Sequence, residues 1–375
     1  MIDEYDAPLI NAYEKGFYDE AINFFSTLYS SVLKTNDYLQ MGVLTGILKV
    51  VKEGIFSGLN NIETYTVLDD HYSDAFGFTE KEVEKAVREY GLTDEIGEVK
   101  KWYNGYKFGN FEIYNPWSIL KYLKNGKTES YWINTASDLT ILRLLKEANE
   151  SMFDGLLNIF NGKSSIQSIN ISSEMNNMQN SQEIWQLMLF SGYLTIDKKI
   201  DEYTYSLKLP NYEVKSFFKE KFLEYNYTEN KSLFKKMINA LLLKDIDKYA
   251  ELLQKILLNS MSYHDGAKEE KFYYNLILGM LLYLDSEYSI KSNIEEGYGR
   301  TDVLMFPLNK LKPGFIFEFK VSETDDNKSI EKAADEALNQ IKDRKYEIEM
   351  KRRKVKDILH LGIAFNGKKV KVKLG

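Results

Sequence analysis

The sequence contains no cysteine, five prolines and three histidines, and each scarcity excludes a class of protein or of site. Without cysteine there is no disulfide framework, no thiolate metal site and no cysteine nucleophile. The three histidines, His71, His264 and His360, lie far apart and do not have metal-ligand spacing. Any metal is therefore expected in a carboxylate-rich site, which suits hard cations such as Mg²⁺ or Mn²⁺.

Long apolar runs are also missing. The longest, Leu276 to Leu284, is too short to cross a bilayer. The first residues, MIDEYD, are acidic where a secretory signal is basic. We therefore expect a cytoplasmic protein without a membrane partner. Hydrophobic residues make up 44% of the 375 positions, which is enough for two or three folded domains.

The net charge of −7 is unevenly distributed along the chain. The segment from Met350 to the C-terminus carries +8, so that the remainder carries −15. Its basic residues are Lys351, Arg352, Arg353, Lys354, Lys356, Lys368, Lys369, Lys371 and Lys373, against the single acid Asp357. Such a segment beside a carboxylate site would suit a domain that handles phosphodiesters. The alternative interpretation is an ordinary solvated charged surface.

The first of three expected segments, residues 1–146, reads as the latter part of an α/β unit. A helical pattern over Phe17–Leu33 is followed by a short apolar run, Met41–Leu44. A further helix is expected to begin at Thr79, because Glu82 stands three residues later in a capping-box pattern. The patch KWYNGYKFGNFEIYNPWSI (101–119) predicts strands with turns at its glycines.

The second segment, residues 147–255, is expected to be helical and winged-helix-like. Its polar stretch, Asn161–Gln182, predicts a loop or linker. After it the patterns predict a helix over Ile184–Phe190, strands over Tyr193–Ile196 and Thr204–Leu209, and another helix, in the order of a winged helix. Winged helices bind DNA or serve as protein-interaction lids. No Lys/Arg stripe marks the first helix, so we favour a structural role.

The third segment, residues 256–375, is expected to form an α/β core with a mixed sheet. The apolar periodicity predicts a helix over Lys268–Leu284, strands over Asp302–Phe306 and Phe315–Val321, a long amphipathic helix over Ser329–Met350, and a final strand over Leu359–Phe365. Glu318 and Lys320 then share one face of their strand. A turn near Asn309–Leu311 would place Asp302 opposite Glu318, with Cβ atoms roughly 5 Å apart.

Two carboxylates at that distance repel each other unless a cation lies between them. A divalent metal would resolve the conflict, lower the pKa of a bound water and stabilise charge on a phosphate. Lys320 would orient or deprotonate that water, or neutralise the phosphate. The alternative for a bare E-x-K pattern, in a chain with 28% charged residues, is an exposed strand face with a salt bridge.

The motifs GRTD (299–302) and EFK (318–320) resemble the core of the PD-(D/E)XK nuclease superfamily. More closely, the stretch from FYYN (272–275) to GIAFNGKKVKV (362–372) is similar to the nuclease domain at the C-terminus of a bacterial AAA-ATPase-like family. The resemblance covers essentially the whole chain. It implies that Asp302, Glu318 and Lys320 are the catalytic motif residues. It also implies that a helix acid, Glu270 or else Glu269, completes the metal site.

The same resemblance implies supporting roles for four further residues. Gln340 and Tyr346 match polar positions on the following helix, and Arg300 and Glu295 match positions that organise the site or contact phosphate. Tyr274 stands where the family often has histidine. The resemblance thus implies a Mg²⁺- or Mn²⁺-dependent hydrolase acting on nucleic acid.

The N-terminal stretch MIDEYDAPLINAY resembles the Walker B strand of the same family. The resemblance implies that Asp3 and Glu4 hold the metal and water-polarising positions and that Thr45 holds the sensor position. A phosphate cradle, G-x-x-x-x-G-K-[ST], is expected upstream of a Walker B strand, and nothing precedes Met1. Gly126-Lys127-Thr128 and Gly162-Lys163-Ser164 lack the first glycine of that motif.

We therefore expect an N-terminally truncated member that does not hydrolyse ATP by itself, and without a P-loop we do not expect ATP as a cofactor; measured ATP turnover would contradict this. A fragment, a late start codon and a separate completing polypeptide stay open. The first functional hypothesis is a metal-dependent nuclease joined to an ATPase-like regulatory region. The second is a non-catalytic interaction module with a vestigial nuclease core, in which the ATPase-like half binds a protein partner or forms an oligomer. An ATP-binding protein whose P-loop is supplied elsewhere ranks third.

Overall fold

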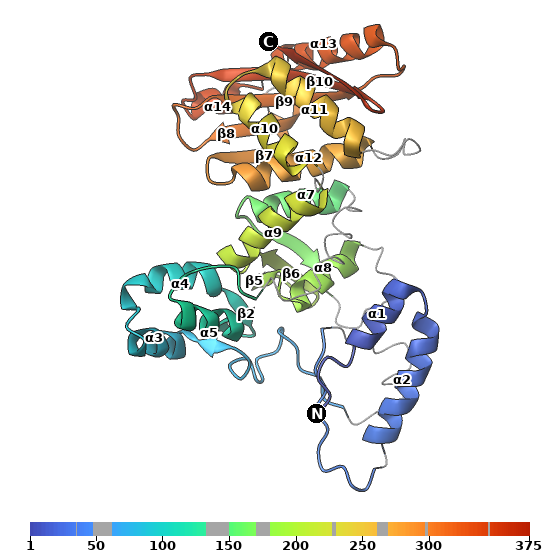
Figure 1. Ribbon diagram of the computed structural model, residues 1–375, viewed down its shortest axis with the longest axis vertical. Coiled ribbons are helices and arrows are strands. Elements are labelled where there is room, and N and C mark those ends of the chain that lie inside the picture. The colour runs from blue at the N-terminus through green and yellow to red at the C-terminus, as the bar shows by residue number, and fades with distance from the viewer. Residues whose placement is uncertain are drawn as a thin grey trace. The chain divides into compact units, whose positions relative to one another are not determined.

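A computed structural model describes residues 1–34, 36–47, 62–132, 150–169, 181–226, 230–260, 269–296, 299–343 and 346–375. Within these ranges some side chains of helices and strands are not described, among them those of residues 269–275 and 292–301. Figure 1 shows the elements along the chain. In the described part, no helix is long and apolar enough to cross a membrane.

The chain divides into two compact units. Unit 1 comprises Met1–Leu144 and Ser164–Lys215, and unit 2 comprises Leu145–Lys163 and Ser216–Gly375. The middle segment expected from the sequence, residues 147–255, is thus shared between both units. Its status as a separate domain stays a prediction.

Unit 1 begins with a helical hairpin of α1 (Ala7–Lys15) and α2 (Tyr18–Leu33). Gly16 ends α1 in the left-handed conformation (φ 78°), which glycine adopts without steric penalty. The expected helix over 17–33 is confirmed as α2. The apolar run Met41–Leu44 forms no regular strand, and only an isolated parallel bridge joins Leu44 to Ile2.

The next part of unit 1 is a small sheet covered by helices. Its elements are β1 (Phe78–Thr79), α3 (Glu80–Glu89), the 3₁₀ turn η1 (Thr93–Glu95), α4 (Ile96–Tyr103), β2 (Tyr106–Phe108), β3 (Phe111–Tyr114) and α5 (Pro116–Asn125), with strand order β1-β3-β2. The expected cap is present, because Glu82 accepts a 2.8 Å hydrogen bond from Thr79 N. Three fully buried tyrosines, Tyr103, Tyr114 and Tyr122, dominate the core.

A second three-stranded sheet, in the order β4-β6-β5, follows in unit 1. Its elements are β4 (Ser165–Ser168), α8 (Ser181–Phe190), β5 (Thr195–Lys199), β6 (Thr204–Lys208) and α9 (Tyr212–Asn226), the last of which contains the unit boundary. The expected helix, two strands and helix are present. The prediction of a loop over the whole of Asn161–Gln182 is wrong, because β4 pairs with β6 there. The Ser/Gln-rich sequence of β4 does not predict a strand, because pairing with β6 specifies this strand.

One buried carboxylate ties unit 1 together. Glu213, at the start of α9, is completely buried. Its Oε1 accepts hydrogen bonds from the backbone of Tyr131 (2.6 Å) and Trp132 (2.8 Å), and its Oε2 accepts from Ser118 Oγ at 2.8 Å. Burial raises the pKa of Glu213, and the three donors oppose that rise. The carboxylate therefore joins α5, the segment at 131–132 and α9.

We expect Glu213→Ala to destabilise unit 1 by roughly 2–4 kcal/mol, because two backbone N–H groups and a hydroxyl would lose their acceptor. Glu213→Gln, which keeps an acceptor oxygen, should cost about 1 kcal/mol. All four tryptophans, at positions 102, 117, 132 and 185, belong to unit 1. Urea titration followed by tryptophan fluorescence therefore measures this unit. Equal losses for the two variants would contradict the assigned role.

Unit 2 is built on a five-stranded mixed sheet. Helices α7 (Glu150–Phe160), α10 (Lys231–Leu242), α11 (Ile246–Ser260) and α12 (Glu269–Leu284) accompany strands β7 (Tyr288–Glu296), β8 (Gly299–Pro307), β9 (Gly314–Val321), β10 (Ile358–Asn366) and β11 (Lys369–Leu374). The strand order is β11-β10-β9-β8-β7. Only β9 and β10 run parallel, joined by a crossover that contains α13 (Asn327–Asp343) and α14 (Ile348–Arg352).

The expected single helix over Ser329–Met350 is wrong, because α13 ends at Asp343 and α14 begins at Ile348. Tyr346, between the two, is completely buried and packs with Ile341 and Met350. On one continuous helix Gln340 and Tyr346 would point about 120° apart. The interruption brings Tyr346 within 3.5 Å of Gln340 Nε2.

Helix α13 lies against β10 at a glycine. A Cβ atom on Gly362 would stand 2.4 Å from the carbonyl oxygen of Ala334 and 2.7 Å from Leu338 N. Only glycine permits this approach. In the parallel register Gly362 is the partner of Glu318, so this close approach of α13 to the sheet occurs beside that carboxylate.

We expect Gly362→Ala to destabilise unit 2 by about 1–3 kcal/mol, because the new methyl group meets helix backbone that cannot rotate away. Gly97 of α4 is a matched control, since a Cβ there meets nothing within 4 Å. Gly97→Ala should stabilise its helix slightly. Hydrogen-exchange mass spectrometry of peptides covering 327–343 should show faster exchange for Gly362→Ala alone. Unchanged protection would argue against the close contact.

Candidate active site

Two carboxylates meet on the α13 side of the sheet in unit 2. The β8–β9 register ends at the pair Val303 and Phe317, in the register that the sequence predicted. Asp302 and Glu318 are the next residues along the two strands. At this end of the ladder Asp302 Oδ2 accepts a 2.8 Å hydrogen bond from Phe319 N. The Asp302 side chain is thereby fixed against the strand that carries Glu318.

Glu318 is almost completely buried, with 2% of its surface exposed. Gln340 Nε2, from α13, donates a short hydrogen bond to Glu318 Oε1. Gln340 in turn lies next to Tyr346, whose hydroxyl oxygen is 3.5 Å away. A charge-assisted hydrogen bond of this kind holds the carboxylate in one orientation. The structure thus brings together Asp302, Glu318, Gln340 and Tyr346.

Lys320 follows Glu318 on the same face of β9 and is half-buried. Its neighbour in the register is Ala364, whose small side chain packs with Ala333 and Ala334 of α13. On the opposite face of the sheet, Phe315, Phe317, Phe319 and Phe365 form a row with successive ring centroids 6.2, 6.2 and 6.0 Å apart. This apolar row fixes the alternation that directs Glu318 and Lys320 toward α13.

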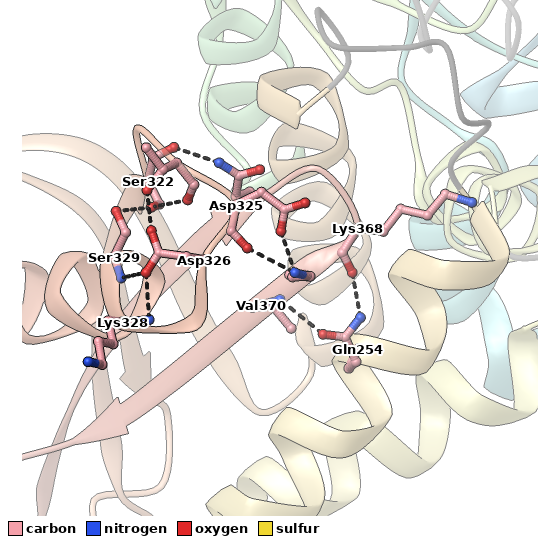
Figure 2. A network of polar contacts seen from close by, with 11 residues as sticks. Gln254, Ser322, Asp325, Asp326, Lys328, Ser329, Lys368 and Val370 are labelled. Atoms are coloured by element: carbon pink, nitrogen blue, oxygen red, sulfur yellow. Dashed lines mark hydrogen bonds and ion pairs between the residues drawn. The ribbon is translucent and has the colours of Figure 1, made fainter.

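The turn after Lys320 is held by a polar network that Figure 2 shows. The Ser322 hydroxyl lies 2.8 Å from both Thr324 O and Ser329 Oγ, and Asn366 donates a 2.8 Å hydrogen bond to Ser322 O. Asp326 accepts from the backbone of Lys328 and Ser329 at 3.0 Å each and so caps α13. Hydrogen bonds, first from Thr324 and then from Ser329, keep the pKa of Asp326 below its usual range.

The same view shows how the edge of the sheet is covered. Gln254 of α11 accepts a 3.0 Å hydrogen bond from Val370 N, and its amide donates to Lys368 O. The side chain therefore takes the place of a neighbouring strand along this part of β11. Lys369 pairs with Asp325 in the turn before α13. Both contacts tie β11 to elements that flank the site.

Several residues implied by the resemblance lie outside the described side chains: Glu270, Glu269, Tyr274, Glu295 and Arg300. Their backbones place Glu269 and Glu270 at the start of α12 and pair Glu295 with Arg300 across β7 and β8. Among side chains that the structure describes, no group of three or more acidic or histidine residues could hold a metal. The roles of these residues stay predictions.

The two described carboxylates nevertheless fit a hard divalent cation. Both are oxygen donors, both come from neighbouring strands, and each is fixed through a hydrogen bond to one of its oxygens. Ligands that are fixed in this way by surrounding hydrogen bonds are typical of metal sites. A third ligand would have to come from a residue such as Glu270.

The basic C-terminal segment is largely paired with acidic residues that precede it. Arg353 lies 2.8 Å from Glu349, and Lys373 lies 3.1 Å from both Glu331 and Asp335. The other ion pairs are Lys351–Glu347, Arg352–Glu349, Lys369–Asp325 and Lys371–Glu331. The count of +8 omitted these acids because they lie before Met350. The contacts favour a paired charged surface over a continuous cationic track.

His360 of β10 also lies on the α13 side of the sheet, and no sequence pattern singles it out. Its Nε2 is 3.6 Å from Glu347 Oε2. Burial lowers the pKa of His360, and the nearby Glu347 carboxylate opposes this shift. The folded protein therefore binds a proton here less readily than the unfolded chain does.

The lowered pKa of His360 predicts a pH-dependent loss of stability. Below the ordinary histidine pKa of 6.5 the unfolded chain gains a proton that the folded protein resists, so stability falls as the pH falls. His360→Gln should remove this dependence. The measurement is the urea concentration at which β10 unfolds in the intact wild-type and His360→Gln proteins, at pH 7.5 and at pH 5.5. Unfolding is followed by the hydrogen exchange of peptides that cover β10. An identical pH response in both proteins would contradict the prediction.

In unit 1 the structure brings together all three residues matched to the ATPase motif. The Thr45 hydroxyl donates a short hydrogen bond to Asp3, and Glu4 N donates to Thr45 Oγ1 at 3.1 Å. Glu4 has a φ of 50°, which is uncommon for a residue with a side chain. Any role for Asp3, Glu4 and Thr45 toward nucleotide stays a prediction.

Comparison with known proteins agrees with the resemblance. Residues 268–374 match the PD-(D/E)XK nuclease superfamily, and residues 1–56 match the family described as predicted AAA-ATPase. An uncharacterized protein in the vnfD 5′ region of Azotobacter chroococcum is 27% identical over 371 residues. That alignment covers 92% of this chain but 65% of the relative, so the chain spans about two thirds of the relative's length. No solved structure matches.

The two matches occur in the order that the motifs predicted, with the nuclease match spanning α12 and the whole five-stranded sheet. The chain is thus similar to the predicted AAA-ATPase family in its N-terminal segment and to the PD-(D/E)XK nuclease superfamily in its C-terminal part.

Proposed function

We propose that unit 2 is a divalent-metal-dependent nuclease whose active site contains Asp302, Glu318 and Lys320. The observation that carries the proposal is the juxtaposition of Asp302 and Glu318 on one face of the sheet, with Lys320 next on that face, inside a domain of the nuclease superfamily. Mg²⁺ or Mn²⁺ is the proposed cofactor, held by Asp302, Glu318 and Glu270.

The bound cation would supply an acidified water and stabilisation of charge on the scissile phosphate. Asp302 and Glu318 hold that position from two strands, and Phe319 N and Gln340 restrict their rotation. Lys320 brings an ammonium group to the same face, where it orients the attacking water or neutralises a phosphate oxygen. Arg300 and Glu295 are proposed to support the site from the β7–β8 end.

The alternative is a non-catalytic interaction module that keeps the nuclease fold. The buried position of Glu318 argues against it. A carboxylate that is 2% exposed and lies next to a second carboxylate destabilises the fold unless a cation or a proton compensates its charge. A domain that binds no cation therefore gains nothing from keeping both as carboxylates. An apolar replacement at either position would remove the conflict.

The proposal predicts cleavage of DNA or RNA in Mg²⁺ or Mn²⁺ and none in EDTA. Asp302→Asn and Lys320→Gln should each lower the rate by roughly 100-fold or more, because each removes a group that acts on the reacting centre. Lys328→Gln is the control, since Lys328 is an exposed lysine in the first turn of α13 of the same unit.

Calorimetric titration with Mn²⁺ distinguishes the proposed metal ligand, Asp302, from the proposed catalytic lysine, Lys320. Asp302→Asn should weaken metal binding, whereas Lys320→Gln should leave it unchanged, because an ammonium group is not a metal ligand. Cleavage that survives both substitutions would refute the assignment of the site. A wild-type protein that binds no Mn²⁺ at millimolar concentration would instead support the non-catalytic alternative.

A further inference from the structure

A group of exposed aromatic rings in unit 1 has no part in the proposed nuclease. It lies in residues 62–76, between the N-terminal hairpin and β1. The rings of Tyr65 and His71 stack with centroids 4.9 Å apart, and Tyr72 meets them edge-on at 5.0 Å and 4.1 Å. Tyr65 is 45% exposed and Tyr72 is 52% exposed. Rings that pack against one another while facing solvent form a ready contact surface.

The backbone beneath these rings is anchored at several points. Gly109 N donates a 2.9 Å hydrogen bond to Val67 O, and a Cβ on Gly109 would stand 2.6 Å from Asp69 O. Asp69 accepts hydrogen bonds from the backbone and hydroxyl of Thr66, at 2.7 and 2.9 Å. Ser73 is buried and donates to Asp70 O. The rings are therefore presented by an ordered segment, so binding would not have to order it first.

The charged side chains within residues 62–76 have one sign, apart from the histidine. Residues 62–76 contain four carboxylates, Glu63, Asp69, Asp70 and Asp74, and no lysine or arginine. Glu63 is in contact with the Tyr65 hydroxyl at 2.8 Å. In the part of the chain that the structure describes, none of the four carboxylates forms an ion pair. The surface thus combines negative charge with the negative faces of aromatic rings, and both attract cations.

We propose that residues 62–76 are a docking surface for a positively charged segment of a protein partner. Arginine fits both features, because its planar guanidinium group stacks on an aromatic ring while it donates hydrogen bonds to a carboxylate. Tyr65, His71 and Tyr72 would provide the stacking faces, and the four carboxylates would provide the counter-charge.

Single-stranded nucleic acid also stacks on exposed rings, but it needs positive charge along its backbone. The four carboxylates would repel phosphates. The same negative charge thus excludes nucleic acid and attracts a basic peptide.

The test uses the full chain and a fluorescein-labelled twelve-residue peptide of alternating glycine and arginine, followed by fluorescence anisotropy. The matched peptide carries citrulline, which has the shape of arginine without its charge. The double variant Tyr65→Leu/Tyr72→Leu should bind the arginine peptide about 5- to 30-fold more weakly than wild type, because two cation–π contacts are lost. The citrulline peptide should bind neither protein.

The choice of the double variant and two control variants distinguish the surface from general attraction to an acidic protein. The double variant changes no charge, so a loss of affinity reports the rings. Tyr65→Phe/Tyr72→Phe, which keeps both rings, should bind like wild type. Tyr90→Leu removes a tyrosine that is 62% exposed at the end of α3, and should also bind like wild type.

Equal affinity of wild type and the Leu double variant would overturn the proposal, as would equal binding of the citrulline peptide. A fluorescein-labelled single-stranded oligonucleotide is the remaining probe. Its binding to wild type, with loss in the Leu double variant, would overturn the proposal in favour of a base-stacking surface.

Discussion

The close approach of α13 to the sheet at Gly362 is the constraint on which the candidate active site depends. A Cβ atom at this position would stand 2.4 Å from the helix backbone, so no side chain fits there. Because Gly362 is the register partner of Glu318, the helix comes close to the sheet where the buried carboxylate needs a donor. Gln340 supplies that donor. A wider separation would leave Glu318 in an apolar layer without this hydrogen bond.

The two ends of α13 are fixed by different means. The polar network of Ser322, Asp326 and Asn366 holds its first turn, which begins at Asn327. Its last turn is followed by a break that returns Tyr346 to the core. Between them lies a helix whose buried face contains alanines where it meets β10. The position of Gln340 is thus set by a cap, a close contact and a helix break acting on one rigid element.

The shared face of Asp302, Glu318 and Lys320 could be predicted from the sequence because side chains alternate between the two faces of a strand. Once a strand begins near Phe315, Glu318 and Lys320 must share a face, and a short turn fixes Asp302 opposite Glu318. The break before α14 could not be predicted, because the helical periodicity continues through it while tertiary packing of Tyr346 overrides it. Strand β4 was missed because its specification comes from β6 and not from its own polar residues.

The ion pairs of the basic C-terminal segment could not be predicted from the sequence either. In the sequence the lysines of β11 are close only to one another. In the fold, Lys373 lies beside Glu331 and Asp335 of α13. Gly362, in the apolar run GIAF (362–365), could have been used to predict the contact with α13, since a glycine inside an apolar strand indicates close approach of another backbone. Period and register can be predicted locally, but contacts between elements distant in sequence cannot.

The two buried glutamates Glu213 and Glu318 show how a structural carboxylate differs from a candidate functional one. Glu213 accepts hydrogen bonds from three neutral donors and joins parts of unit 1. Glu318 is equally buried, but the neighbouring strand carries a second carboxylate, Asp302, which accepts a hydrogen bond from Phe319 N next to Glu318. Neutral donors alone stabilise one buried carboxylate, whereas two that face each other require a positive charge between them or a proton on one. The neighbour, more than the burial, is therefore what supports the proposed role of Glu318 as a metal ligand.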